Sequence, residues 1–280
     1  MNERRVSGIR LRVHLLFWAV IGLSVAAGYF VEILTLFVIV LIHEMGHVAV
    51  ARELGWQVTE IQFLPFGGVA HMEEEAAAEP LDEIVVALAG PFMNVVMAFL
   101  SLVFWRIGLW SEEWTRFFVT SNFLIAGFNL LPIWPLDGGR ILQALLGLRL
   151  PYRMAALWSL GASISLSAVL LGVGVFQLHV NAVAVGGYLL AVNVQAFLRF
   201  PYQFIRFLMI KYSRAPQGHG LYPVRLTPRT TVWEAASHLR KGRYHLIYIT
   251  GGEGGLVAEE KLLHALLFEQ KKHLPISTLL

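Results

Sequence analysis

Several apolar stretches of close to 20 residues, almost free of charge, constrain the fold of this 280-residue chain more than any other feature. A helix needs about 20 apolar residues to cross a bilayer core of roughly 30 Å. Charged residues make up 15% of the chain, whereas a soluble domain carries about 25%. The chain is therefore expected to be an α-helical polytopic membrane protein. About six transmembrane helices are expected, at residues 13–31, 33–53, 82–106, 116–134, 154–175 and 179–199.

Basic residues predict how these helices are oriented. Arginines and lysines gather before the first stretch, between the fourth and fifth, and after the sixth, whereas the opposite loops hold only Arg106 and Arg116 beside two glutamates. Cytoplasmic loops are enriched in Lys and Arg, so both termini are expected in the cytoplasm. This bias also explains the isoelectric point near 9.3, and no direct nucleic-acid binding is expected. The first stretch has the form of a secretory signal, but a second follows at once, which favours a retained helix.

The composition changes after the last apolar stretch. From about residue 215, short apolar strands alternate with Gly turns and an amphipathic helix, a pattern typical of a small α/β domain. We therefore expect a transmembrane core at residues 1–200, a basic linker or interfacial helix at 201–214, and a cytoplasmic α/β domain at 215–280.

The apolar run from Ile33 to Ala51 contains three ionisable residues, His43, Glu44 and His47. Each unpaired polar group in hydrocarbon costs several kcal/mol, so ionisable residues there usually have a function. Histidines four apart lie on one helix face, a spacing suited to one zinc ion, and the glutamate beside them could act as general base on a water molecule. The alternative is two buried histidines that hydrogen-bond neighbouring helices. The chain has no cysteine, which excludes thiolate ligands, a cysteine nucleophile and disulfides.

A catalytic zinc ion usually has three protein ligands and one open position, and Asp137 in "NLLPIWPLDGGR" is the best candidate for the third ligand. Pro132 and Pro135 cannot continue a helix, and two glycines after the aspartate free the backbone. The helix is therefore expected to break at membrane depth, where irregular backbone is tolerated if it lines a cavity or is buried in protein. The alternative is an aspartate that caps the N-terminus of the following helix.

The stretch "FLPFGGVAHMEEE", residues 63–75, is too short to span the bilayer and is rich in Gly, Pro and aromatic residues, which favours a re-entrant loop or hairpin. A peptide bond inside a transmembrane helix is shielded, so a protein substrate must become extended, and a strand edge can hold it by β-augmentation. Phe66 and Gly67 are expected to contact that substrate. His71 is a candidate extra ligand, although a single loop histidine is more often a surface residue.

Two asparagines in apolar segments are candidate site residues. Asn94 ends "LAGPFMN", in which Gly90 allows close helix approach and Pro91 kinks the helix. Asn94 is expected to support a metal ligand, with a purely structural role equally open. Asn129 precedes the break before Asp137. Its amide could hold a substrate carbonyl or stabilise the oxyanion, or could only form a hydrogen bond between packed helices.

The motifs HEMGH, GPFMN and LPIWPLDGGR, in this order, resemble the site-2 protease family of intramembrane zinc metalloproteases, over roughly residues 10–200. The resemblance implies a zinc metalloendopeptidase in which His43, His47 and Asp137 bind zinc and Glu44 is the general base. A metal transporter is the first alternative, but it would need polar residues spread over several helices and would give Glu44 no role. A non-catalytic scaffold is the second, but such members usually lack the Glu or a His of the first motif.

The stretches LPFGG and NLLPIWPLDGG, with the short C-terminal domain, resemble more closely the sporulation branch of this family in endospore-forming bacilli. Members of that branch process the inactive precursor of a late mother-cell sigma factor, in the membrane around the forespore and under restraint by membrane-bound inhibitor proteins. The resemblance implies the same substrate, partners and location, and substrate positioning by Asn129 and Pro135. A protease of the same family that acts on another membrane-tethered regulator is the alternative.

Residues 221–268 are similar to a single cystathionine-β-synthase (CBS) motif. Such motifs usually pair to bind an adenine nucleotide between them. An ATP site would therefore need two chains, and a homo-oligomer is expected. A docking domain without a ligand is the equally weighted alternative.

Overall fold

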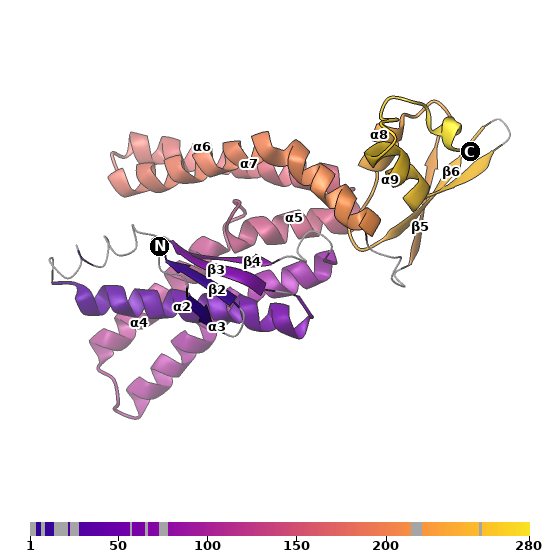
Figure 1. Ribbon diagram of the computed structural model, residues 1–280. Helices are drawn as coiled ribbons and strands as arrows, with labels where there is room; N and C mark the ends of the chain where they lie inside the picture. The colour runs from indigo at the N-terminus through magenta and orange to yellow at the C-terminus, as the bar shows by residue number, and fades with distance from the viewer. Residues whose placement is uncertain are drawn as a thin grey trace. The chain divides into compact units, whose positions relative to one another are not determined.

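A computed structural model describes residues 4–6, 9–13, 22, 28–56, 58–64, 67–72, 78–213, 220–251 and 254–280 (Figure 1). The chain divides into two compact units. The first is formed by Met1–Glu75, Asp82–Pro132 and Leu136–Ile141. The second is formed by Ala76–Leu81, Ile133–Pro135 and Leu142–Leu280.

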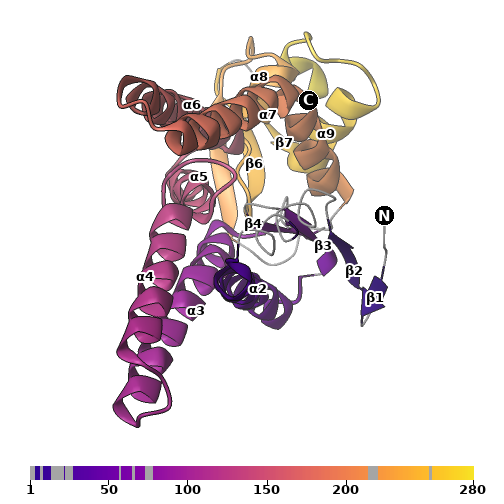
Figure 2. The ribbon, with the colours of Figure 1, turned by 90° about the vertical axis from the view of Figure 1, so that its left-hand side faces the viewer.

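The described part of the first unit contains three long helices: α2 (Phe30–Glu53), α3 (Pro80–Arg106) and α4 (Glu112–Asn129). Helices α3 and α4 run side by side as a helical hairpin, with α2 next to them (Figure 2). A Cβ built on Gly46 of α2 would lie 2.8 Å from the carbonyl oxygen of Ala89 in α3. The absence of a side chain at this position therefore lets the two helix backbones approach closely, as small residues do in membrane proteins.

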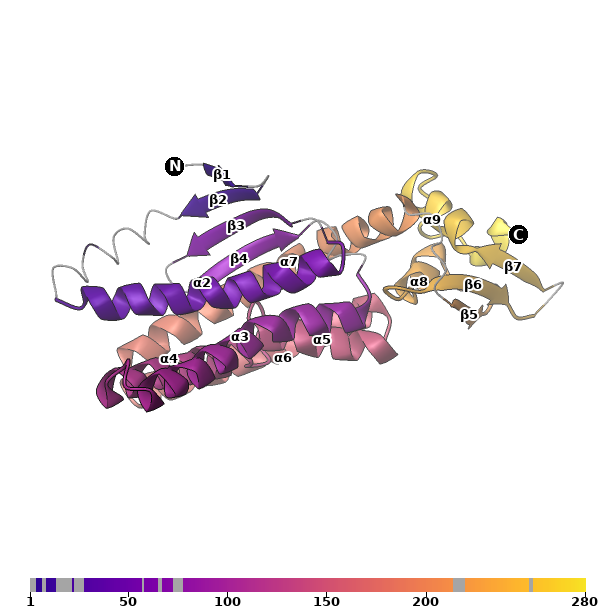
Figure 3. The same ribbon diagram turned by 90° about the horizontal axis from the view of Figure 1, so that it is seen from below.

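A four-stranded sheet lies beside α2 in the same unit (Figure 3). The strand order is β1-β2-β3-β4, with β2 parallel to β3 and the other neighbouring pairs antiparallel. The described residues of the region expected to form a re-entrant loop or hairpin, 63–64 and 67–72, lie in the antiparallel pair β3–β4, and β4 is at one edge of this sheet. The strands are Arg4–Val6, Ile9–Val13, Val58–Leu64 and Gly67–Met72, numbered in chain order.

In the second unit, α6 (Tyr152–Phe176) and α7 (Val180–Ser213) pack side by side along most of their length (Figure 1). A Cβ on Gly186 of α7 would lie 2.7 Å from the backbone nitrogen of Leu171 in α6. The absence of a side chain at Gly186 therefore lets the backbones of α6 and α7 come into contact, as small residues do in membrane helices. Helix α5 (Asp137–Arg149) connects to α6 and begins at the predicted third ligand.

Among the described residues, four helices are long and apolar enough to cross a membrane: α2, α3, α6 and α7. Of the six predicted spans, the first, 13–31, lies largely outside the described residues. The span predicted at 116–134 falls mainly in α4, whose 18 residues include three charged residues and make it less apolar than the other four. The chain is a multi-pass membrane protein, and the number of six spans stays a prediction.

Helix α7 is longer than a helix needs to be to cross a bilayer core. Its 34 residues span about 51 Å at 1.5 Å per residue, against a hydrocarbon core of roughly 30 Å. Residues 201–213, predicted as a linker or interfacial helix, continue the helix through Pro201. The last turns bury Phe204, Phe207 and Leu208 in the apolar core of the C-terminal α/β region, so α7 supplies part of the core of that region.

The C-terminal region is a three-stranded sheet covered by short helices. The strand order is β5-β6-β7, with β5 parallel to β6 and β6 antiparallel to β7. Thr231 and Glu234 form a reciprocal capping box at the start of α8, which satisfies backbone N–H groups that the helix leaves free. The CBS assignment stays a prediction. The elements are β5 (Leu221–Leu226), α8 (Val232–Ser237), β6 (Tyr244–Ile249), β7 (Gly255–Ala258), α9 (Glu259–Leu267) and η1 (Ile276–Leu279).

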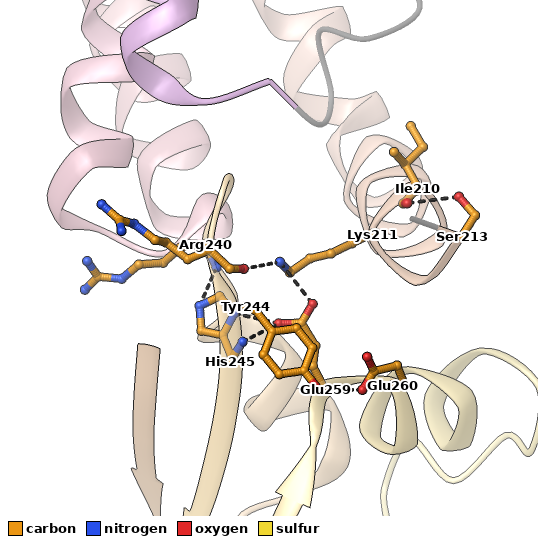
Figure 4. Close-up of polar contacts among 9 residues, drawn as sticks. Ile210, Lys211, Ser213, Arg240, Tyr244, His245, Glu259 and Glu260 are labelled. Carbon is orange, nitrogen blue, oxygen red and sulfur yellow. Dashed lines mark hydrogen bonds and ion pairs between the residues drawn. The ribbon is translucent and has the colours of Figure 1, made fainter. Parts of the chain in front are cut away.

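A polar network around the buried His245 and Glu259 also connects the end of α7 to this region (Figure 4). Lys211 forms an ion pair with Glu259 at 3.0 Å and donates a hydrogen bond to the Arg243 carbonyl at 2.6 Å. The second oxygen of Glu259 accepts from the ring Nδ1–H of His245 at 2.7 Å, and Nε2 of the same ring accepts from the Arg240 backbone N–H at 3.2 Å. Because Nε2 accepts and Nδ1 donates, the network holds His245 in a neutral tautomer.

This network predicts an acid-sensitive C-terminal region. Burial lowers the pKa of His245 below its ordinary value of 6.5, and Lys211 and Arg240 act in the same direction, although Glu259 opposes them. The folded state therefore binds fewer protons than the unfolded state. The stabilisation is complete above about pH 6.5 and is lost as the pH falls through that value towards the lower pKa of the folded state. Thermal unfolding of the full chain from about pH 7.5 to about pH 5 should show this loss.

A permanently neutral His245→Gln variant should show a weaker dependence of its unfolding temperature on pH over the same interval. His238→Gln removes an exposed histidine of the same region and should keep the wild-type dependence. An unchanged dependence in His245→Gln would contradict the prediction.

Candidate metal centre

Helix α2 presents His43 and His47 from one buried stripe. Ile39, His43, His47 and Ala51 recur every four residues, and all are buried, as expected for one face of an α-helix. The two imidazole rings stand nearly perpendicular, at 84°, with their centroids 4.8 Å apart. Glu44 is also buried and adjoins this stripe. One turn of the helix thus carries two ligand-type nitrogens and one carboxylate, all buried.

Asp137, the first residue of α5, completes a compact group with the two histidines. Its Oδ2 lies 3.2 Å from Nε2 of His43 and 3.3 Å from Nε2 of His47. The two Nε2 atoms are themselves 3.2 Å apart. Three ligand-type atoms therefore form a nearly equilateral triangle in a buried position.

The hydrogen bonds behind this triangle fix the protonation of His43. The Phe118 carbonyl can only accept, so the atom of Asn122 that faces it at 2.9 Å is the amide nitrogen. The amide oxygen of Asn122 then accepts from Nδ2 of Asn94 at 3.0 Å. The amide oxygen of Asn94 consequently accepts from Nδ1 of His43 at 2.6 Å. His43 carries its proton on Nδ1, and its Nε2 directs a lone pair at the triangle.

His47 is oriented in the same way. Its Nδ1 donates to the carbonyl oxygen of Val86 in α3 at 2.7 Å. Both Nε2 atoms therefore present lone pairs to each other and to the Asp137 carboxylate. Three electron-rich atoms at this separation repel one another unless a cation lies among them.

The dimensions of the triangle fit a tetrahedral zinc ion. Bonds of about 2.0–2.1 Å at tetrahedral angles place neighbouring ligand atoms roughly 3.3 Å apart, and the three separations here are 3.2, 3.2 and 3.3 Å. Two imidazole nitrogens and one carboxylate oxygen are ligands that Zn²⁺ accepts, and three protein ligands leave one position open for reaction.

Two glycines make room for this geometry. A Cβ built on Gly90 of α3 would lie 2.6 Å from Cε1 of His47 and 2.7 Å from Cε1 of His43, so only glycine lets α3 close over both rings. A Cβ on Gly138 would overlap the backbone carbonyl groups of Leu130 and Leu131. The start of α5 can therefore fold back against the end of α4, which places Asp137 beside the histidines.

The predicted substrate-binding residues do not belong to this group of possible ligands. Asn129 is the last residue of α4, and its Nδ2 donates to the Ile125 carbonyl of its own helix at 3.1 Å. Pro135 follows a cis peptide bond in the second unit. Phe66 lies outside the described residues, and Gly67 is the first residue of the edge strand β4. Their roles in substrate binding, and the alternative ligand role of His71, stay predictions.

Sequence reasoning missed two side chains near this centre. Asn122 is fully buried and supports Asn94; an asparagine within the predicted span 116–134 was the available signal. Arg140 lies one turn after Asp137 on α5 and interacts electrostatically with Glu44. In the sequence Arg140 is one of several basic residues between the fourth and fifth predicted spans, and its position there does not indicate which carboxylate it faces.

Asp137→Asn should weaken zinc binding by about 100-fold or more, because a neutral amide is a poor ligand for the ion. The measurement is zinc release from the purified full-length chain to a chelator. Asp82→Asn, the same substitution in the first turn of α3, should release zinc at the wild-type rate. Full zinc retention by Asp137→Asn would exclude Asp137 as a ligand.

Comparison with known proteins agrees with this chemistry. The model of Peptidase family M50 matches residues 31–109 and 105–170. Stage IV sporulation protein FB of Bacillus subtilis (strain 168) is 28% identical over 97% of this chain and 96% of its own length. A zinc metalloprotease of Methanocaldococcus jannaschii is 29% identical over 65% of this chain and 56% of its own length. The solved site-2 protease from Methanocaldococcus jannaschii aligns with a TM-score of 0.57 and 28% identity, over 69% of this chain and 94% of that one.

The family match spans half of the chain and contains the whole His43–His47–Asp137 group. The solved neighbour is alike in both sequence and fold. The chain therefore belongs to Peptidase family M50, the site-2 proteases, and is a zinc metalloendopeptidase of the membrane.

Proposed function

We propose that this protease cleaves a membrane-associated precursor, the pro-sequence of a late mother-cell sporulation sigma factor. The observation that carries the proposal is the match to stage IV sporulation protein FB, which extends over 97% of this chain and so includes the C-terminal α/β region. The match to the zinc metalloprotease of Methanocaldococcus jannaschii covers only 65% of the chain, and the match to the solved structure covers 69%. The similarity to a sporulation protein therefore extends over nearly the full length of both chains and includes the C-terminal region.

In the proposed mechanism, His43, His47 and Asp137 hold the zinc ion and Glu44 moves the proton. Bound zinc supplies Lewis acidity, which polarises a peptide carbonyl and lowers the pKa of water to about 7. The Glu44 carboxylate accepts the proton of the attacking water and later delivers it to the leaving amine nitrogen. Asn94 holds the His43 ring through the 2.6 Å hydrogen bond to Nδ1, so that its Nε2 keeps its direction.

The substrate is proposed to bind in an extended form. Strand β4 has a neighbour on one side only among the described strands of its sheet, so its outer edge offers backbone N–H and C=O groups to a further strand. Gly67, the first residue of β4, and Phe66, which precedes it in the sequence, are proposed to contact that strand. Asn129 and Pro135, on either side of the break before Asp137, are proposed to position its scissile peptide.

The proposal includes the cellular setting. Both termini lie in the cytoplasm, in the mother-cell membrane that surrounds the forespore, and membrane-bound inhibitor proteins restrain the enzyme. The C-terminal region, as a CBS-like domain, associates between chains in a homo-oligomer and binds ATP. The second candidate is a protease of the same family that acts on another membrane-tethered regulator.

Co-expression with the sigma-factor precursor, followed by an immunoblot for processing, tests the proposed substrate. The matched control is the Glu44→Gln chain, which should leave the precursor intact. A second membrane-tethered regulator, expressed in the same way, tests the alternative. An intact precursor together with cleavage of the second regulator would reject the sporulation substrate and leave the protease activity in place.

A further inference from the structure

Both backbone polar groups of Trp134 are held by side chains of the α6–α7 pair. The Trp134 N–H donates to Oγ of Ser163 on α6 at 2.9 Å. The Trp134 carbonyl accepts from Nδ2 of Asn193 on α7 at 2.5 Å. The Trp134 side chain packs against the apolar core that includes Ala156 and Leu160 of α6. One residue is therefore fixed on three sides by two helices far from it in the sequence.

The two polar side chains are themselves locked. Ser163 donates to the Ser159 carbonyl at 2.9 Å, which uses its one hydrogen and leaves a lone pair for Trp134. Asn193 uses its second amide hydrogen on the Leu189 carbonyl at 2.8 Å. Each side chain is thus anchored to the preceding turn of its own helix and has one hydrogen-bonding direction left for Trp134.

These side chains occupy costly positions. Ser163 and Asn193 are fully buried in helices long and apolar enough to cross a membrane. Oδ1 of Asn193 is buried without a hydrogen-bond partner among the described residues, which opposes folding. Polar groups at such positions usually have a function. Both side chains form hydrogen bonds to the backbone of Trp134 and not to each other's helix. We therefore look for their function in the segment around Trp134, and not in holding α6 and α7 together.

That segment leads directly to the metal centre. Trp134 lies three residues before Asp137, and three residues reach at most about 11 Å even when fully extended. The backbone turns already at Leu136, whose carbonyl accepts from the N–H groups of Gly139 and Arg140 at 3.0 and 3.3 Å. The backbone between Trp134 and Asp137 therefore has little conformational freedom, and the position of Trp134 limits where the Asp137 carboxylate can lie.

We propose that Ser163 and Asn193 are positioning residues, which clamp the Trp134 peptide and thereby fix the Asp137 carboxylate for zinc binding. The inference rests on the ligand role of Asp137 in the proposed function. It assigns to α6 and α7 a part in building the metal centre through the covalent chain alone, without any side chain of these helices entering the ligand group.

The test compares zinc release to a chelator and the visible absorption spectrum of the cobalt-substituted protein, both on the purified full-length chain. Ser163→Ala removes the acceptor of the Trp134 N–H, and Asn193→Leu independently removes the donor to its carbonyl. Each variant should release zinc about tenfold faster than wild type and should alter the cobalt spectrum, which reports ligand geometry. Ser163→Thr keeps the hydroxyl group and should restore both readouts.

Two serines of the same helix provide matched controls. Ser165 is exposed and makes the same kind of bond to its own helix, to the Gly161 carbonyl at 3.0 Å. Ser167 is fully buried, and its hydroxyl has no hydrogen-bond partner among the described residues. Ser165→Ala and Ser167→Ala should both behave as wild type, which separates the loss of the clamp from the loss of any serine on α6.

Two outcomes would overturn the inference in different ways. Wild-type zinc release and an unchanged cobalt spectrum in Ser163→Ala and Asn193→Leu, with fast release by Asp137→Asn, would reject the clamp and leave the ligand assignment intact. This holds even if the variants unfold at lower temperature, because a purely structural role predicts that result. Wild-type release by Asp137→Asn would instead reject the ligand role and the positioning role together.

Discussion

Glu44→Gln is expected to abolish peptide cleavage while the protein keeps its zinc. The amide has nearly the same shape as the carboxylate, so it can occupy the same buried position on α2. It cannot accept the proton of the attacking water, and loss of a general base costs about 10² to 10⁴ in rate. The measurements are metal content of the purified variant and its cleavage of a membrane-tethered substrate.

Glu53→Gln provides the control, because Glu53 is an exposed glutamate of the same helix. It should retain both zinc and activity. Loss of zinc in Glu44→Gln would identify Glu44 as a ligand, and wild-type turnover would show that the base is another group.

Gly90→Ala is expected to destroy the metal centre without touching a ligand. The new methyl group would lie 2.6 and 2.7 Å from ring carbons of His47 and His43, closer than carbon atoms can pack. Either α3 moves away or the imidazoles rotate, and overpacking of this kind costs about 1–3 kcal/mol in stability. Rotation would also break the hydrogen bonds from Nδ1 to Asn94 and to Val86. Zinc affinity should therefore fall by about 100-fold or more.

Gly127→Ala is the matched control, since a Cβ at Gly127 in α4 meets nothing within 4 Å. Alanine is also the better helix former. This variant should retain wild-type zinc affinity and stability. Tight zinc binding by Gly90→Ala would mean that α3 does not press against the two rings as the structure indicates.

The group of three possible metal ligands could be predicted from the sequence, because two of its members are one helical turn apart and the third follows a visible helix break. His43 and His47 are one turn apart on one helix, and the helix geometry alone places them together. Asp137 follows a recognisable break with two prolines. The structure brings these three residues within contact of one another. The histidine pair needs no knowledge of how the helices pack, whereas Asp137 was predicted from the helix break and the family resemblance.

The supporting contacts could not be predicted in this way. Asn122 supports Asn94, and Gly90 contacts both rings, only because α3 and α4 pack beside α2 at one particular rotation. Ser163 and Asn193 read as ordinary residues of two spans until the Trp134 peptide is seen between them. Long-range packing decides which polar group meets which, and a single sequence carries little of that information.

The end of α7 carries a helical repeat of apolar residues that the prediction of a linker or interfacial helix did not use. Phe200, Phe204, Phe207 and Leu208 recur at the spacing of one helix face, and all are buried. The basic residues of 201–214 suggested a linker or interfacial helix, and charge gave no indication of a packing partner. The periodicity favours the helix over the linker, because apolar residues repeated every three or four positions form one face of a helix.

The continuous α7 also limits how this protein can be rearranged into chimeras. Residues 215–280 taken alone would lack the part of their apolar core that Phe204, Phe207 and Leu208 supply. A chain that ends at Ser213 would in turn leave those three side chains exposed to water. The exchangeable cassette is therefore longer than the C-terminal sheet and must include the helix that enters it. Any recombination that swaps this region between proteases needs its crossover upstream of α6, because α6 and α7 pack side by side along most of their length.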